Sequence, residues 1–123
     1  MRLNLTTANP AVAGSDADRA LAGDAILAEA VRRIREHFSP AHVVLFGSRA
    51  RGESGADSDY DLLVVMREAV DWRAAGRIYG VLRGIDANFD ILTESLADWQ
   101  RLRELRPSFE HRIATEGMDL ICE

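Results

Sequence analysis

The chain has 123 residues, of which 47% are hydrophobic, and this is enough for one core but too little for two separate domains. Its formal net charge is -5, so no basic stripe is available to follow a nucleic-acid backbone, which argues against action on long nucleic acid. All fifteen cationic residues are arginine, and the absence of lysine excludes a Walker-type phosphate loop and a covalent lysine intermediate.

The cysteine content points to a reduced compartment. Cys122 is the single cysteine and cannot form an internal disulfide, and the three histidines are too scattered for a zinc-binding pattern. No run approaches the roughly twenty apolar residues of a membrane span. We therefore expect a cytoplasmic protein without contact to a membrane.

The first elements are read from polarity and periodicity. Residues 1–15 are small, polar and without a pattern, and we expect a flexible arm there, followed by one domain over residues 16–123. Apolar residues then recur at helical spacing from Ile26 to Phe38. The short β-branched run His42–Phe46 is typical of a buried strand.

A glycine and a serine follow this strand directly. Gly47 allows a sharp turn and leaves no Cβ in the way of a ligand, while Ser48 lies where a short helix over residues 49–52 would begin. The N–H groups of a helix start attract anions and the Ser48 hydroxyl adds a donor, so the turn is suited to a phosphate group. The alternative is that Ser48 is only a helix N-cap.

Two arginines lie in the same turn. Arg51 is a candidate for positioning a triphosphate or a carboxylate, because guanidinium groups bind both in a bidentate manner. Arg49 is the weaker candidate. Both arginines could instead be solvated, or pair with Glu53 or Asp57.

Two carboxylates stand at the entrance of the next apolar run. Asp59 and Asp61 are two positions apart, so in an extended segment their side chains project from one face, while Tyr60 and Leu62 point to the other. Hard oxygen ligands on one face suit Mg²⁺, which also removes the repulsion between ionised carboxylates. We expect a central strand with this acidic pair at its rim. The alternative is a pair of loop acids without a function.

A third acid is available from a later strand. Asp90 lies between Phe89 and Ile91, so it interrupts a strand that could have been wholly buried. Asp86 competes for the role, but it follows the expected end of a helix, where a polar turn residue needs no function. The alternative for Asp90 is a rim charge paired with an arginine.

The other segments read as helices and a closing strand. Helical spacing from Trp72 to Leu82, with Asp71 as cap, is followed by helices over residues 96–105 and 108–116 and a strand over residues 118–122. Gly117 is expected to cap the last helix. The glycines at four-residue spacing suggest close backbone packing, and three aromatic residues are assigned to the core or an interface: Gly76, Gly80, Gly84; Trp72, Tyr79, Trp99.

The combination of these motifs resembles the nucleotidyltransferase superfamily of DNA polymerase beta, and within it the small stand-alone minimal nucleotidyltransferases (MNT type). The resemblance runs from Val43 to Val65 at motif level and continues more loosely to Thr93. It implies an α/β fold in which a small mixed β-sheet is packed with helices. It also implies ATP as substrate, one or two Mg²⁺ ions, and these site residues: Asp59, Asp61 and Asp90 for the metal and catalysis; Gly47, Ser48 and Arg51 for the phosphates.

The implied reaction is transfer of AMP from ATP to a hydroxyl group, with Asp90 binding the second metal or accepting the proton. MNT proteins are typically paired with a helical HEPN toxin, to which they act as antitoxin by adding AMP to a tyrosine. Two alternatives stay open: an antitoxin that acts by binding alone, and an enzyme that modifies a small hydroxylated molecule as a homodimer.

Overall fold

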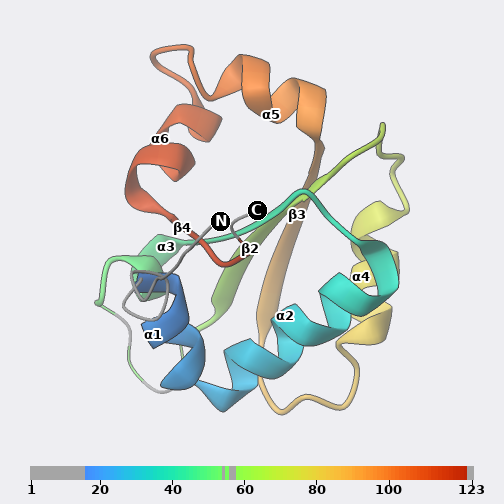
Figure 1. Ribbon diagram of the computed structural model, residues 1–123, viewed down its shortest axis with the longest axis vertical. Helices are drawn as coiled ribbons and strands as arrows, with labels where there is room; N and C mark the ends of the chain where they lie inside the picture. The colour runs from blue at the N-terminus through green and yellow to red at the C-terminus, as the bar shows by residue number, and fades with distance from the viewer. Residues whose placement is uncertain (1–15, 54, 56–57, 122–123) are drawn as a thin grey trace, which may run out of the picture.

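A four-stranded sheet lies between two layers of helices in the computed structural model, which describes residues 16–53, 55 and 58–121 (Figure 1). The strand order is β3-β2-β1-β4. β2 pairs in parallel with β3, and β1 pairs antiparallel with β2 and with β4. The sheet is therefore mixed, as the sequence predicts. The strand bounds are His42–Phe46 for β1, Tyr60–Met66 for β2, Phe89–Ser95 for β3 and Met118–Asp119 for β4.

Three helices cover one face of the sheet (Figure 1). They are α1 (Asp16–Ala22), α2 (Ala25–Phe38) and α4 (Ala74–Val81). Leu27, Ala30 and Ile34 of α2 are buried against Leu62 and Val64 of β2, because the apolar positions of the helix recur on one side. This layer holds the larger of the two cores.

Helices α5 (Leu96–Leu102) and α6 (Phe109–Glu116) lie over the opposite face (Figure 1). Their core is smaller and is built on Trp99 and Ile113, which pack with Leu63 and Val65 of β2. The short helix α3 (Gly47–Ala50) continues directly from β1. Among the helices of the described part, none combines the length and the apolar composition that a bilayer crossing requires.

Several predicted helices and strands differ from the structure in their boundaries. Helix α1 is not foreseen, α3 begins two residues earlier than predicted, and β4 is shorter than the predicted strand over residues 118–122. Cys122 and residues 1–15 lie outside the described residues. Helix α4 begins at Ala74, so Asp71 does not cap it, although the Asp71 carboxylate accepts a hydrogen bond from the Arg73 N–H. Trp72 therefore precedes the helix and is 85% exposed, so it does not belong to the core.

The glycine predictions fail for a different reason. A methyl group added at Gly76, Gly80 or Gly84 would meet no atom within 4 Å, so these glycines pack against no other backbone. Gly117 does end α6, but with extended backbone and not as a left-handed cap. A Cβ at Gly117 would come within 2.6 Å of the Ile113 carbonyl oxygen, so close backbone approach explains this glycine.

Candidate active site at the rim of the sheet

The strand pairing brings the predicted site residues to one rim of the sheet. β1 ends where β2 begins, because the two strands are antiparallel, and Phe46 pairs with Asp61. β3 begins at the same rim because it runs parallel to β2, and Asp90 pairs with Asp61. Paired positions on neighbouring strands lie about 4.8 Å apart. Asp61 and Asp90 thus lie side by side. Gly47 directly follows Phe46, the residue of β1 that pairs with Asp61.

Gly47 fits closely against Asp61. Its φ of 74° lies in the left-handed region, and a Cβ at this position would overlap the Oδ2 atom of Asp61. A side chain of any kind would therefore push the Asp61 carboxylate out of its place. The sequence identifies Gly47 as a turn residue, and the structure adds that the turn and the carboxylate are in contact.

The electrostatics of the rim centre on Asp61. Burial raises the pKa of this half-buried carboxyl above its usual range, and the negative charges of Asp90 and Asp59 raise it further. The Arg51 guanidinium acts in the opposite direction. Asp59 and Asp90 are themselves exposed. A cation bound at the rim would relieve this crowding of negative charge around Asp61.

The donor set fits a hard cation such as Mg²⁺. Asp61 and Asp90 supply carboxylate oxygens from adjacent strands, and Asp59 lies two positions before Asp61. Within residues 16–53, 55 and 58–121, no three side chains of His, Cys, Asp or Glu already converge as a metal-binding group. The strand register places Asp61 and Asp90 side by side, and Asp59 is the third carboxylate of the candidate metal site.

The turn at Gly47 and Ser48 differs in detail from the prediction. Phe46, not Ser48, takes the N-cap position of α3, and no side chain caps this helix. Ser48 lies within the first turn, so the N-cap alternative for Ser48 is wrong. Arg51 follows the helix and pairs with Glu53, with 3.0 Å between Nε and Oε1. Asp86 lies in a bend outside β3 and is exposed, as expected for a turn residue.

Arg49 is a structural residue, and the sequence does not foresee how. Its side chain is only 15% exposed, and its guanidinium lies 3.8 Å from the centre of the Tyr60 ring. It donates two hydrogen bonds, of 3.0 and 2.7 Å, to the Ser58 carbonyl oxygen. These two hydrogen bonds connect the segment that leads to Asp59 with the turn at Gly47 and Ser48.

Asp24, the N-cap residue of α2, connects this helix to Tyr60. One of its oxygens accepts the Leu27 N–H as an N-cap, and the other accepts the Tyr60 hydroxyl at 2.7 Å. An aspartate just before an apolar helical pattern is a recognisable N-cap signal, so the cap is within reach of sequence analysis. The contact with Tyr60 spans 36 positions and leaves no such signal.

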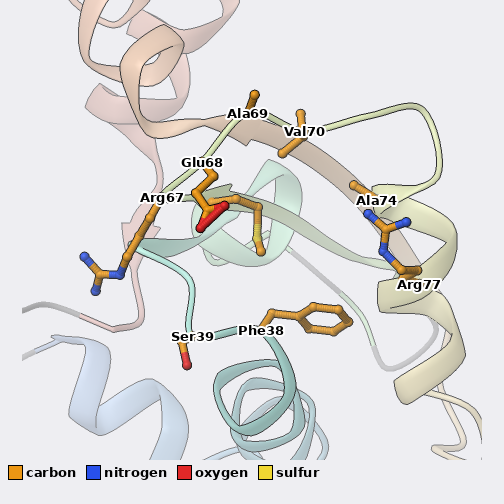
Figure 2. Close-up of a pocket in the computed structure, with 9 residues that line it drawn as sticks. Phe38, Ser39, Arg67, Glu68, Ala69, Val70, Ala74 and Arg77 are labelled. Carbon is orange, nitrogen blue, oxygen red and sulfur yellow. The ribbon is translucent and has the colours of Figure 1, made fainter.

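Two cavities lie near the ends of β2. One of about 600 Å³ opens on the α2 side of the active rim, beside Arg49, Tyr60 and Asn88. Another of about 300 Å³ lies at the far end of the strand, between the last turn of α2 and the loop before α4. Figure 2 shows this second cavity, with Phe38 and Ser39 on one side and Arg67 and Arg77 on opposite sides. It is a full strand length away from Asp61, and we assign no nucleotide to it.

A second carboxyl pair lies on the face that carries α5 and α6. Burial raises the pKa of Glu94 to about 8, and a hydrogen bond shared with Glu110 and the Glu110 charge raise it as well. One carboxylate oxygen of Glu94 is buried and finds no hydrogen-bond partner among the described residues. Because two ionised carboxylates have no proton to share, the hydrogen bond between Glu94 and Glu110 forms only when one of the two carboxyls is protonated.

Comparison with known proteins agrees with this geometry. Residues 27–114 match the model of the nucleotidyltransferase domain family. The Gly47 turn and the paired carboxylates lie within the matched residues, and the chain belongs to the nucleotidyltransferase domain family. A comparison with curated protein sequences finds no match.

Solved structures share the fold at low sequence identity. A toxin-antitoxin crystallised with AMP-PNP superimposes with a TM-score of 0.57 at 20% identity, covering 76% of this chain and 70% of that chain. A Sulfolobus solfataricus protein assigned as a nucleotidyltransferase gives 0.53 at 24% identity, with 86% of each chain covered. A mutant of the toxin-antitoxin MntA-HpeT gives 0.56 at 16% identity, covering 78% and 72%. These likenesses establish the α/β nucleotidyltransferase fold.

Proposed function

We propose that this domain transfers AMP from ATP to a hydroxyl group of a partner protein, and that it is the antitoxin of an MNT/HEPN toxin-antitoxin pair. The observation that carries the proposal is the register of β2 and β3, which sets Asp61 beside Asp90 and next to the Gly47 turn. Membership of the nucleotidyltransferase domain family supports the reaction class.

Each residue of the rim has a role in the proposed reaction. Asp59 and Asp61 would hold Mg²⁺, and the bound ion would supply positive charge for the transferred phosphate and the leaving pyrophosphate. Gly47 and Ser48 hold the β and γ phosphates through backbone N–H groups and the Ser48 hydroxyl.

Transfer exchanges one bond to phosphorus for another. The acceptor oxygen bonds to the α-phosphorus while the bond from that phosphorus to the β-bridging oxygen breaks, and pyrophosphate leaves. The proton of the acceptor hydroxyl goes to Asp90 if this carboxylate is the general base, and to solvent if Asp90 binds a second ion. The exposure of Asp90 suits either role, because an acceptor from another molecule can reach it.

The proposed partner is supported by the structural neighbours. One of them is a toxin-antitoxin crystallised with AMP-PNP, an ATP analogue, and another is a mutant of the toxin-antitoxin MntA-HpeT. A protein acceptor brings its own hydroxyl to the exposed Asp90, and the nucleotide domain does not have to enclose it. Mg²⁺, ATP and a helical HEPN toxin are therefore the proposed cofactor, substrate and partner.

Co-expression tests the proposal directly. The chain is produced together with the proposed helical HEPN toxin, and the toxin is examined by intact-mass and peptide mass spectrometry together with cell growth. We expect AMP on a toxin tyrosine and restored growth. The combined Asp59→Asn and Asp61→Asn variant should lose both effects, whereas Asp86→Asn, which changes an exposed acid in a bend, should keep both. If the double variant restores growth fully without adding AMP, the transfer hypothesis is wrong and the protein inhibits the toxin by binding alone.

A further inference from the structure

A small cavity joins the Gly47 turn to α6. It has a volume of about 100 Å³, and its lining includes Gly47 and Arg51 from the turn and Phe109, Arg112 and Glu116 from α6. The share of one water in the liquid is about 30 Å³, so the cavity has room for a small anion. Sites for whole drug-sized ligands start near about 300 Å³. A nucleoside does not fit here.

Two arginines from different elements line this cavity. Arg51 comes from the end of α3 and Arg112 from α6, 61 positions further along the chain. Among the described residues, each forms an ion pair with an exposed glutamate, Arg51 with Glu53 at 3.0 Å and Arg112 with Glu116 at 3.5 Å. Exposed pairs of this kind contribute little stability and exchange readily for a better anion.

The floor of the cavity is apolar and well fixed. Ile113 is only 3% exposed, and Phe109 meets Phe46 edge to face with 5.8 Å between the ring centres. These contacts hold α6 against β1 and thereby fix the backbone from which Arg112 extends. A charged ligand at Gly47 would lie near both arginines and beside this apolar base.

We propose that Arg112 is a second cation of the polyphosphate site and binds, with Arg51, the phosphate groups of a nucleoside triphosphate that leave as pyrophosphate. This inference rests on the proposed function and adds a residue to it. The phosphates lie at Gly47 and the reacting phosphorus lies toward Asp61, so Arg112 stands at the leaving-group end. Glu116 lines the same cavity, and its negative charge opposes binding there.

Titration calorimetry with three probes tests the assignment: Mg-ATP, Mg-pyrophosphate and AMP. Arg112→Gln should weaken Mg-ATP and Mg-pyrophosphate roughly tenfold, the size of one charge-assisted hydrogen bond, and leave AMP unchanged. Arg112→Lys should recover part of the loss, because lysine keeps the charge without the fork geometry. Arg101→Gln is the matched control, since Arg101 is a similarly exposed arginine that pairs with Asp98 away from the cavity.

A change of opposite sign separates this role from a structural one. Glu116→Gln should tighten Mg-pyrophosphate binding about twofold to threefold, because it removes a like charge and frees Arg112. Equal affinities of Arg112→Gln and Arg101→Gln for Mg-pyrophosphate would overturn the assignment and leave the proposed function standing. Absence of Mg-ATP and Mg-pyrophosphate binding by the wild-type protein would overturn both.

Discussion

Two carboxyl pairs occupy the same face of the sheet, and they differ in what covers them. Asp90 and Glu94 are both on β3 and are separated by one alternating position, Leu92, which packs into the core under α5 and α6. The pair of Asp61 and Asp90 lies at the open rim, where Asp90 is exposed. Glu94 and its partner Glu110 lie further along the strand, beside α6, with one Glu94 oxygen fully buried.

The difference shows how location decides the way in which a carboxyl pair is neutralised. At the rim, solvent and a metal-bound nucleotide can reach the charges, so both carboxylates can stay ionised and accept a cation. Beside α6, where one Glu94 oxygen is buried, burial favours the uncharged carboxyl, and a proton shared between Glu94 and Glu110 is the alternative to ionisation of both. Two acids on one strand therefore serve different ends, one in the proposed reaction and one in the packing of α6.

The strongest test of this difference is nucleotidyl transfer itself. Asp61→Asn should reduce transfer below detection, because it removes the proposed central metal ligand, while the variant remains folded and equally or more stable. Glu94→Gln should transfer at the wild-type rate, because this pair is remote from the turn. Transfer is measured by pyrophosphate release with the partner present, and folding by circular dichroism. Loss of transfer in both variants would contradict the assignment of different roles to the two carboxyl pairs.

The next largest effect is expected at Gly47. Gly47→Ala should cost about 3 kcal/mol of unfolding free energy, from the left-handed backbone and from the overlap with Asp61. Gly52→Ala is the matched control: Gly52 has a φ of 73° but open space around it, so only the backbone cost of about 1 kcal/mol applies. Urea denaturation gives both values. If the two variants are equally destabilised, the contact between the turn and Asp61 is unimportant.

A further prediction concerns the carboxylates at the rim of the sheet and the dependence of ATP binding on metal. Mg-ATP at about one hundred times its dissociation constant should stabilise the protein by about 2.7 kcal/mol, which raises the melting temperature by several degrees. ATP with a chelator should give a much smaller shift, because the phosphates then face Asp59 and Asp61 without a cation. Thermal unfolding followed by circular dichroism measures both. Equal shifts with and without metal would contradict the proposed site.

The smallest effect concerns the covered pair. The pKa of Glu94 is about 8 in the folded protein against an ordinary value of 4.5, so the folded state binds this proton more tightly than the unfolded state. The wild type should therefore lose stability as the pH rises from about 4.5 to about 8. Glu94→Gln should avoid that loss and be more stable at pH 9 by on the order of 1 kcal/mol, since solvent screens part of the burial cost.

A matched variant controls the titration experiment. Glu104→Gln removes an exposed acid whose ion pair with Arg103 is 3.5 Å long, and its stability difference from the wild type should not depend on pH. Urea unfolding at pH 5 and pH 9 supplies the four comparisons. The same pH dependence in wild type and Glu94→Gln would assign the proton to another group.

Much of the sheet could be predicted from the sequence because its strands are apolar and their turns are marked by glycine. His42–Phe46 is found at its predicted bounds, and the strand after Asp59 is central with Asp61 at its rim. Asp90 lies on the neighbouring strand, as the run from Phe89 suggests. The family resemblance contributes the order in which these segments meet, which periodicity alone does not specify.

The errors arise where an effect depends on three-dimensional context. The spacing of Trp72 continues the apolar stripe of α4, but the helix begins two residues later, so the side chain points into solvent. The contact of Tyr60 with Asp24 and the place of Arg112 beside Gly47 each join distant parts of the chain. No local pattern in the sequence encodes such contacts, and they are the part of the candidate site that only the structure reveals.

The position of β3 at the edge of the sheet restricts how a partner can reach Asp90. An edge strand normally invites pairing with a strand from another chain. Here the outward N–H of Ile91, the residue after Asp90, is already bonded to the Tyr79 hydroxyl of α4 at 2.9 Å. An incoming strand would have to displace α4 from this edge. Under the proposed function, the acceptor hydroxyl must therefore arrive over the face of the sheet and not by strand addition.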